Sequence, residues 1–344
     1  MQIDIHVFPN TSPPGWGSGS GSGSGGLATS ATTTASSGTK AEGSSRGSGS
    51  GPSALPLRII THNIRYATAS PSKGEEKWSV RYPRMCAQLD FLASGPACSF
   101  MCLQEVLHRQ LADLQSHLGP SGWRHIGVGR DDGQTRGEFS PVFYDSNRWD
   151  CARSQTYWLS SEPRKAGSVG WDAALPRIVT MGEFSLKTPR GSEADGEGTR
   201  VVVMSTHFDH IGAVARRESA KLIVRLAAEW VGSSARFSGV FLGGDFNSEP
   251  SDEGYKSITA KDTNWVDVQT VFQPERRYGN QLTFTGFQPE RHPEEKKRID
   301  FVFARKGEGV GFVSYGVMAN RFDDGVFLSD HCAVVADVEV PVVA

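Results

Sequence analysis

The sequence contains no long hydrophobic run. None of its apolar stretches approaches the roughly 20 residues that a membrane-spanning helix requires. Met1 to Val7 also lack the basic start and the extended apolar stretch of a secretory signal peptide. Both absences argue against membrane insertion and secretion. We therefore expect no membrane contact and an intracellular location, in the cytoplasm or the nucleus.

Cysteine is scarce, with five in 344 residues, and no pair has Cys-x-x-Cys spacing. An odd number without that spacing is typical of reduced thiols inside a cell and argues against a disulfide framework. Cys98 and Cys102 alone are too few ligands for a zinc site.

The sequence also lacks an excess of positive charge. Its 36 lysines and arginines face 38 aspartates and glutamates, so the formal net charge is −2. Proteins that bind duplex nucleic acid non-specifically usually carry a net positive charge. The composition therefore argues against a duplex endonuclease and favours local recognition of phosphate or binding of a small molecule.

Residues 1–56 differ in composition from the rest of the chain. Gly17 to Gly26 is almost pure Gly-Ser, and the residues that follow are mostly Ser, Thr, Ala and Gly. Such a stretch buries too little apolar surface to offset its ordering entropy, so we expect a disordered tail. Residues 57–344 are expected to form one catalytic domain, because candidate site residues occur from Asn63 to His331.

Polar side chains recur directly after short apolar runs that are bounded by turn residues. Such runs predict buried strands, and sites in open α/β sheets are usually built at strand ends. Carboxylates, amides and imidazoles gathered there are typical of a metal-dependent phosphoesterase. The positions are Asn63 after Leu57–Ile60, Glu105 after Phe100–Leu103, His207 after Val201–Met204, Asp245-Phe246-Asn247 after Gly239–Leu242, and Ser329-Asp330-His331.

The remaining pattern predicts an α/β fold in which two β-sheets pack face to face with helices outside. Leucines at helical spacing predict a helix over Glu105–Leu118, which Gly119 and Pro120 end. Further elements are expected as helices at Val80–Leu92 and Ala215–Val231, and as strands at Pro141–Tyr144, Val179–Leu186, Leu282–Thr285, Ile299–Ala304, Gly311–Val317 and Ala333–Val338.

Glu105 and Asp330 are the candidate ligands of a divalent metal ion. Their carboxylate oxygens suit Mg²⁺, and also Mn²⁺, which take one or two protein carboxylates together with water and substrate phosphate. Glu105 has an alternative interpretation, because the helix dipole favours an acid at a helix N-terminus.

Asp245 and Asn247 follow two glycines, which allow the backbone to approach an anion closely. Asp245 is a candidate to orient or deprotonate the attacking water, and Asn247 is a candidate to donate to a phosphoryl oxygen. The alternative is a Gly-Asp-x-Asn turn held by its own side-chain hydrogen bonds.

His331 is expected to face the phosphate, while the adjacent Asp330 points elsewhere. A second carboxylate should hold the imidazole, fix its tautomer and raise its pKa. Asp300 is the candidate for this role. The alternative for Asp300 is a salt bridge with Arg298.

Three further residues are candidates for phosphate chemistry. His207 could protonate the leaving group or stabilise charge on the phosphoryl oxygens, although a lone histidine is often structural. Asn63 could support the metal-binding glutamate or donate to phosphate, and Arg65 is a candidate phosphate clamp.

In their order along the chain, these elements resemble the endonuclease/exonuclease/phosphatase superfamily over about Leu57 to Val338. The resemblance implies a four-layer, deoxyribonuclease I-like sandwich, dependence on Mg²⁺ and in-line attack of water on phosphorus. It also implies a metal ion near Glu105, Asp330 and Asn63, with Asn63 and Asn247 on the phosphate.

Segments such as Gly137–Pro141 and Gly170–Arg177 resemble a microbial subgroup near the carbon-catabolite-repressor and nocturnin-type deadenylases. Trp171 and Arg177, both in the second segment, join the expected substrate contacts.

Two positions depart from the superfamily pattern. His62 stands where an apolar residue is usual. Arg65 stands where abasic-site enzymes have an aspartate, which weakens an analogy with those enzymes. The resemblance leaves open whether Asp245 or the Asp300–His331 pair activates water.

The favoured expectation is a Mg²⁺-dependent phosphodiesterase on RNA or single-stranded nucleic acid, similar to a 3′–5′ exonuclease. Trp171, Trp158 and Phe139 could stack on bases or instead be packed in the core. One alternative is a phosphatase of a small soluble nucleotide, sugar or inositol phosphate, which the slightly acidic charge and loop insertions such as Pro163 to Pro176 favour. The other is an inactive phosphate-binding module. In each case we expect a monomer.

Overall fold

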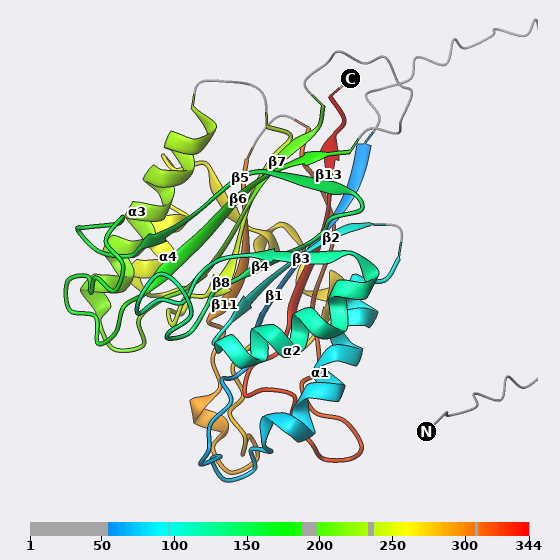
Figure 1. Cartoon of the computed structure of the whole chain (residues 1–344), viewed down its shortest axis with the longest axis vertical. Helices are drawn as coiled ribbons and strands as arrows, with labels where there is room; N and C mark the ends of the chain where they lie inside the picture. Colours follow the sequence, from blue (N-terminus) through cyan, green and yellow to red (C-terminus); the bar gives the residue numbers. More distant parts are fainter. Residues whose placement is uncertain (1–53, 96, 188–197, 233–236, 307–308, 344) are drawn as a thin grey trace, which may run out of the picture. The chain divides into compact units, whose positions relative to one another are not determined.

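The computed structural model describes residues 54–95, 97–187, 198–232, 237–306 and 309–343 (Figure 1). The expected tail, residues 1–56, therefore lies outside the described residues except for its last three, which begin the first strand. The described residues fold into two mixed β-sheets with helices on their outer faces.

One sheet contains seven strands and the other contains six. Each is mixed, because β1 runs parallel to β2 but antiparallel to β13, and β8 runs parallel to β7 but antiparallel to β11. The first sheet has the order β10 (Arg277–Gly279), β12 (Gly311–Val317), β13 (Val334–Pro341), β1 (Ala54–Asn63), β2 (Cys98–Gln104), β4 (Val142–Asp145) and β3 (Trp123–Ile126). The second has the order β5 (Trp149–Trp158), β6 (Ile178–Leu186), β7 (Arg200–His207), β8 (Gly239–Asp245), β11 (Asp300–Arg305) and β9 (Trp265–Asp267).

Helices cover the outer faces of both sheets through apolar clusters. Leu89 and Leu114 pack in a cluster with buried residues of the first sheet, and Ile223 packs in a cluster with buried residues of the second sheet. Among the described helices, none combines the length and the hydrophobicity that a membrane crossing requires. The α-helices are α1 (Trp78–Ala93), α2 (His108–Leu118), α3 (Ala213–Val231) and α4 (Glu253–Ile258), and short 3₁₀ helices span Gly119–Ser121, Val268–Val271, Pro274–Arg276 and Pro293–Glu295.

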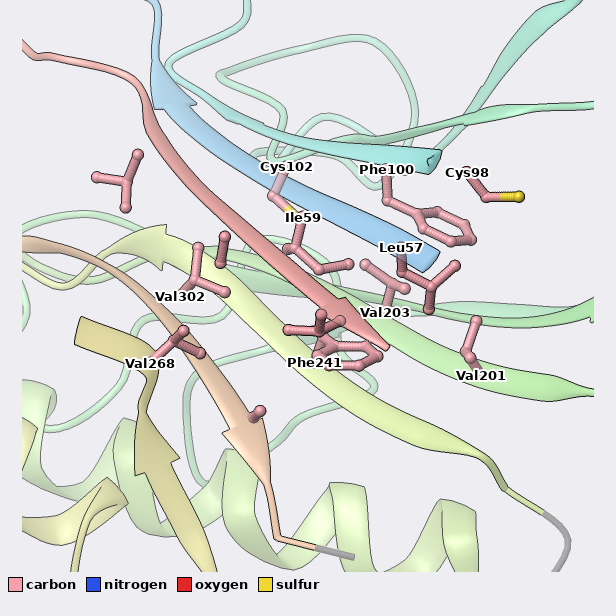
Figure 2. Close-up of a cluster of buried hydrophobic side chains, with 14 of the residues drawn as sticks. Leu57, Ile59, Cys98, Phe100, Cys102, Val201, Val203, Phe241, Val268 and Val302 are labelled. Carbon is pink, nitrogen blue, oxygen red and sulfur yellow. The ribbon is translucent and has the colours of Figure 1, made fainter. Parts of the chain in front are cut away.

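The two sheets pack face to face around a buried apolar core, part of which Figure 2 shows. Leu57 and Ile59 of β1 share this core with Val203 of β7 and Phe241 of β8, whereas Ile60 belongs to the cluster that includes α1 and α2. This alternation follows the two-residue period of a strand. Each such buried side chain contributes roughly 1.5–3 kcal/mol to stability. The expected four-layer α/β sandwich is confirmed.

The register of the strands brings their polar ends together. Asn63 at the end of β1 pairs with Gln104 at the end of β2, and His207 pairs with Asp245 across β7 and β8. Asp300, the first residue of β11, pairs with Asp245 from the other side. Residues far apart in the sequence therefore meet at one end of the sandwich.

Some elements differ from the sequence expectations. The predicted helix over Glu105–Leu118 begins only at His108, because Glu105 adopts a left-handed backbone conformation. The predicted strand Leu282–Thr285 forms only isolated bridges, through Phe284, in the part of the chain that the structure describes. β5 has no counterpart among the predicted strands, because its central residues are exposed and the apolar alternation is missing.

Candidate active site

Two tight backbone turns aim side chains at the candidate site. Glu105, directly after β2, has a φ of 59°, and Asn247, two residues after β8, has a φ of 44°. Non-glycine residues rarely adopt positive φ, and such conformations occur preferentially at functional sites. Gly244 is required nearby, since a Cβ there would lie 2.5 Å from the carbonyl oxygen of Thr206.

Asn63 joins the two sheets at the centre of the site. Its Nδ2 donates to Oε1 of Glu105 and to Oδ2 of Asp245, each at 3.0 Å. Its Oδ1 accepts a hydrogen bond from the backbone N–H of Arg65 at 3.0 Å. Asn63 is fully buried, so these bonds fix the separation of the two carboxylates.

His331 and Asp300 form a buried pair. The imidazole Nδ1–H donates to Oδ2 of Asp300 at 2.8 Å, and Nε2 lies 3.7 Å from Oδ2 of Asp245. Burial alone would lower the pKa of His331, but the two carboxylates outweigh it and hold that pKa well above its usual value. Arg298, the alternative partner of Asp300, instead pairs with Asp267.

Asp245 is the carboxylate on which the site converges. Its Oδ1 accepts a hydrogen bond from the backbone N–H of Asn247 at 2.9 Å, and its Oδ2 lies 3.4 Å from Nε2 of His207. Burial, together with the charge of Asp300, raises the pKa of Asp245 to about 7. The alternative interpretation of Gly-Asp-x-Asn, a turn held by a side-chain hydrogen bond, is therefore also correct, and this bond holds the Asp245 carboxylate within the site.

His207 is held as a neutral imidazole. Burial and the charges of Arg177 and Arg130 lower its pKa well below the usual value. Nε2 accepts a hydrogen bond from Nδ2 of Asn247 at 3.1 Å. The one N–H of the neutral imidazole is then on Nδ1, which lies 3.7 Å from Oε2 of Glu138.

Glu138 and Arg130 were not among the candidates that sequence reasoning selected. The Arg130 guanidinium donates to both carboxylate oxygens of Glu138, at 2.7 and 3.0 Å. Burial and the charge of Glu105 raise the pKa of Glu138 to about 7. Glu138 lies in Gly137–Pro141, a segment that resembles the microbial subgroup, but the residues of this segment do not indicate a contact with His207.

Glu105 and Asp330 form the acidic part of the site. Burial favours the neutral form of Glu105, but hydrogen bonds from Asn63 and from the backbone of Tyr66 outweigh it and lower the pKa. The pKa of Asp330 is raised, first by burial and then by the charge of Glu105, although His331 opposes this shift.

These carboxylates fit a hard divalent cation. The negative charge of Glu105 raises the pKa of Asp330, and a cation bound between the two carboxylates would offset this repulsion. Carboxylate oxygens are also the ligands that Mg²⁺ and Mn²⁺ prefer. Ligand atoms of Asp245, Asp300 and His331 also lie within 4.8 Å of one another. His331 already donates to Asp300, so Glu105 and Asp330 are the better candidates among these acids for holding a cation.

Arg65 lies at the rim of the acidic group. Its Nε and Nη2 donate to the carboxylate of Glu75 at 3.1 and 3.3 Å, and its Nη1 lies 4.0 Å from Oε2 of Glu105. Burial opposes its charge, but the hydrogen bonds that it donates to Glu75 and the charges of Asp330 and Glu105 outweigh burial and raise the pKa of Arg65. Glu75 is a third residue that the sequence pattern did not indicate.

Arg177 is buried beside the loop that follows β7. Its Nε donates to Oδ2 of Asp209 at 3.3 Å, and its Nη2 lies 3.0 Å from Nδ1 of His210. Asp209 also accepts hydrogen bonds from the backbone of Ile211 and Gly212. Arg177 therefore steadies the loop next to His207.

The three candidate aromatic side chains have different environments. Trp158 and Phe139 are buried, so the core-packing interpretation holds for both. Trp171 is 44% exposed, so that interpretation does not apply to it.

His62 supports the His331 backbone from a fully buried position. Its Nε2–H donates to the carbonyl oxygen of His331 at 3.2 Å. Burial lowers the pKa of His62 to about 4, despite the bond to His331. The departure from an apolar residue therefore provides a buried hydrogen bond.

Replacing His62 with leucine should make the free energy of unfolding less sensitive to acid. Unfolding restores an ordinary pKa near 6.5, so the unfolded wild type binds more protons between about pH 6.5 and 4. Wild-type stability therefore falls as the pH drops through this window. Between pH 7 and pH 5 the wild type should lose about 2 kcal/mol more than the variant. Urea unfolding at both pH values measures this difference.

His117 provides the control, because it is partly exposed and pairs with Asp90. The His117→Leu variant should retain the acid sensitivity of the wild type. Parallel pH dependence of wild type and His62→Leu would show that His62 is not buried in its neutral form.

A sequence profile of the Endonuclease/Exonuclease/phosphatase family matches residues 60–331, and the chain belongs to this family. Its members are phosphoesterases, and they are generally dependent on divalent metal ions. A comparison with curated proteins gives no match.

Solved structures share the fold over most of the chain. A family member from Bacteroides vulgatus is 34% identical, with a TM-score of 0.70, covering 83% of this chain and 99% of its own. A mannosyl-6-phosphatase from Bacteroides thetaiotaomicron is 29% identical, with a TM-score of 0.67, covering 84% of this chain and 100% of its own. The human nocturnin catalytic domain with bound sulfate is 16% identical, with a TM-score of 0.61, covering 83% of this chain and 94% of its own, and it shows the fold alone.

Proposed function

We propose that this chain is a Mg²⁺-dependent phosphatase of a small phosphorylated metabolite, with a sugar phosphate as the favoured substrate class. The chemistry rests on one observation: Asn63 joins Glu105 to Asp245, and His331 lies beside the same Asp245 oxygen. Similarity to the mannosyl-6-phosphatase, at 29% identity across that entire chain, supports the substrate class. Mn²⁺ is an alternative ion.

Glu105 and Asp330 are proposed to hold the metal ion, with Asn63 orienting Glu105 through its 3.0 Å hydrogen bond. When bound, Mg²⁺ would polarise a phosphoryl oxygen and offset the negative charge of the phosphate. The backbone N–H of Tyr66 fixes the other oxygen of Glu105, so the carboxylate is preorganised for this role.

Asp245 is proposed as the base that takes a proton from the attacking water. A pKa of about 7 suits this role, because the ideal pKa of a general base lies near the working pH. His331, kept protonated by Asp300, lies 3.7 Å away and stabilises charge that develops on the phosphoryl oxygens. Water activation is thereby assigned to Asp245 rather than to the Asp300–His331 pair.

Asn247 is proposed to contact the phosphoryl oxygens, and His207 is proposed to position the Asn247 amide through the 3.1 Å hydrogen bond to its Nε2. Because the pKa of His207 is well below its usual value, this residue acts as a neutral hydrogen-bonding group and does not deliver a proton to the leaving group. Arg65 and Arg177 supply positive charge at the edge of the site. In this proposal they provide the local positive charge with which a chain of net charge −2 recognises phosphate.

A substrate panel with Mg²⁺ tests the proposal. It contains mannose 6-phosphate, adenosine 5′-monophosphate, an inositol phosphate and a labelled oligoribonucleotide. We expect phosphate release from mannose 6-phosphate with a kcat/KM of about 10⁴ M⁻¹s⁻¹ or more, the lower end for enzymes on their own substrates. Cleavage of the oligonucleotide without phosphate release from any small substrate would contradict the phosphatase assignment.

A nuclease acting on RNA or single-stranded nucleic acid remains the second candidate. The exposed Trp171 favours it, because bases stack on aromatic side chains. An inactive phosphate-binding module is the third candidate, and it would bind inorganic phosphate but release none from any substrate in the panel. The intact set of acids, amides and imidazoles argues against that outcome.

A further inference from the structure

Exposed apolar side chains gather on two loops of the second sheet. Among the described residues, Val169, Trp171 and Leu175 precede β6, and Ile211 and Val214 follow β7. Each is more than a third exposed, and Ile211 reaches 65%. Large apolar side chains that are exposed together frequently mark a binding surface.

Hydrogen bonds tie the two loops to one another. The carboxylate of Asp172 accepts from the backbone N–H groups of Val214 and Ala215, at 3.1 and 2.6 Å. A Cβ at Gly212 would lie 2.6 Å from the carbonyl oxygen of Asp172, so the backbones are in close contact. The apolar side chains are therefore presented by one connected unit.

The same unit is attached to the catalytic residues. The backbone N–H of Phe208 donates to the carbonyl oxygen of Asp245 at 2.8 Å, and Asn247 donates to the carbonyl oxygen of Phe208 at 3.0 Å. Asp209 then fixes Ile211 through its backbone N–H at 3.0 Å. The apolar loops consequently border the phosphate site.

Trp171 has an unusual backbone conformation. It is the first central residue of a turn closed by a 2.9 Å hydrogen bond from Ala173 to Gly170, and its φ is 53°. A left-handed conformation costs roughly 1–2 kcal/mol for a residue other than glycine. Glu105, Asn247 and Arg65 also have positive φ and lie at the site, and Asn264 has positive φ elsewhere in the described residues. The Trp171 side chain is 44% exposed, so this turn presents an indole to solvent.

We infer that Trp171, Ile211 and Val214 form an apolar rim that binds the sugar ring of the substrate beyond its phosphate. This inference rests on the proposed function and specifies the part of the metabolite that distinguishes it from inorganic phosphate. An indole face stacks on the apolar C–H face of a pyranose, the ring of the favoured substrate class, and a nucleobase is the alternative that the experiment distinguishes. The aliphatic side chains exclude water from the edge of that ring.

Binding measurements by titration calorimetry in the absence of Mg²⁺, so that the ligands are not hydrolysed, test the rim without relying on turnover. The ligands are mannose 6-phosphate and adenosine 5′-monophosphate, which differ in their ring, and inorganic phosphate, which has none. The main variant is Trp171→Gly, because glycine adopts positive φ without strain and the fold should be retained. The Kd of a ring-bearing ligand should rise about 5- to 150-fold, the range measured for stacking, and phosphate affinity should change much less.

The controls separate a binding role from a structural one. Trp171→Phe should restore most of the affinity for the ring-bearing ligand, and thermal unfolding of Trp171→Gly should occur no lower than that of the wild type. Phe91, which is 74% exposed on α1, is the matched aromatic, and Phe91→Ala should leave every Kd unchanged.

The possible outcomes distinguish the rim from the proposed function. A loss of affinity for mannose 6-phosphate supports the rim as a site for the sugar ring, whereas a loss confined to adenosine 5′-monophosphate would overturn it in favour of a nucleobase. Equal losses for phosphate and for ring-bearing ligands, no loss at all, or failure of the wild type to prefer a ring would overturn the rim. Failure of the proposed function appears separately, as absence of phosphate release by a wild type that still binds ring-bearing ligands.

Discussion

The His331→Asn variant is expected to lose about 10²–10⁴-fold in kcat, the range for groups that act in proton transfer and charge stabilisation. The imidazolium is held by Asp300 at 2.8 Å and lies 3.7 Å from Asp245, so it is placed beside the proposed base. Asparagine cannot carry the positive charge that this position requires. Steady-state kinetics with mannose 6-phosphate, at saturating Mg²⁺, measure the loss.

A matched histidine variant shows that the loss is specific. His117 is 37% exposed, and its replacement by asparagine should leave kcat within about twofold, since surface substitutions usually have small effects. Circular dichroism of both variants tests whether they are folded. A folded His331→Asn protein with nearly wild-type kcat would exclude this residue from the chemistry.

The Glu105→Gln variant is expected to show the second large effect. Glutamine keeps the size and an acceptor oxygen for the backbone N–H of Tyr66, but it removes the charge that a divalent cation requires. The Mg²⁺ concentration for half-maximal activity should rise by at least about 10–100-fold, the range for residues that merely support metal ligands. Measuring the rate against Mg²⁺ concentration separates this effect from a lower kcat.

Glu229 offers a control for Glu105. It is an exposed carboxylate on α3 that pairs with Arg225, so Glu229→Gln should not change the response to Mg²⁺. If Glu105→Gln reached the wild-type rate at the same Mg²⁺ concentration, Glu105 would not be a metal ligand.

Much of the fold could be predicted because its signals are local. The runs that became β1, β2, β7 and β8 are short, apolar and followed by polar residues, which is typical of buried strands. β5 could not be predicted in this way, since its exposed centre has no apolar alternation. The start of α2 was misplaced because the left-handed turn at Glu105 has no sequence signature.

The candidate site was partly predictable for the same reason. Asn63, Asp245 and His331 were recognisable because each follows or precedes a strand. Glu138 was not, because it approaches His207 only after the bridge between Phe139 and Val106 has formed.

The acidic partners of Arg65 and Arg177 could not be predicted from the sequence either. Arg65 pairs with Glu75 and Arg177 pairs with Asp209, so their guanidinium groups are positioned by acids that the sequence pattern does not connect to them. Contacts of this kind depend on how loops fold back on the sheets. Composition and spacing do not determine such contacts.

Distant segments of the chain are proposed to surround one divalent cation beside the phosphate. Anomalous scattering from a crystal grown with Mn²⁺ and inorganic phosphate tests it most directly. We predict an anomalous peak within coordination distance of the carboxylates of Glu105 and Asp330, with phosphate next to Asn247. A manganese peak elsewhere, or none at saturating Mn²⁺, would contradict the account.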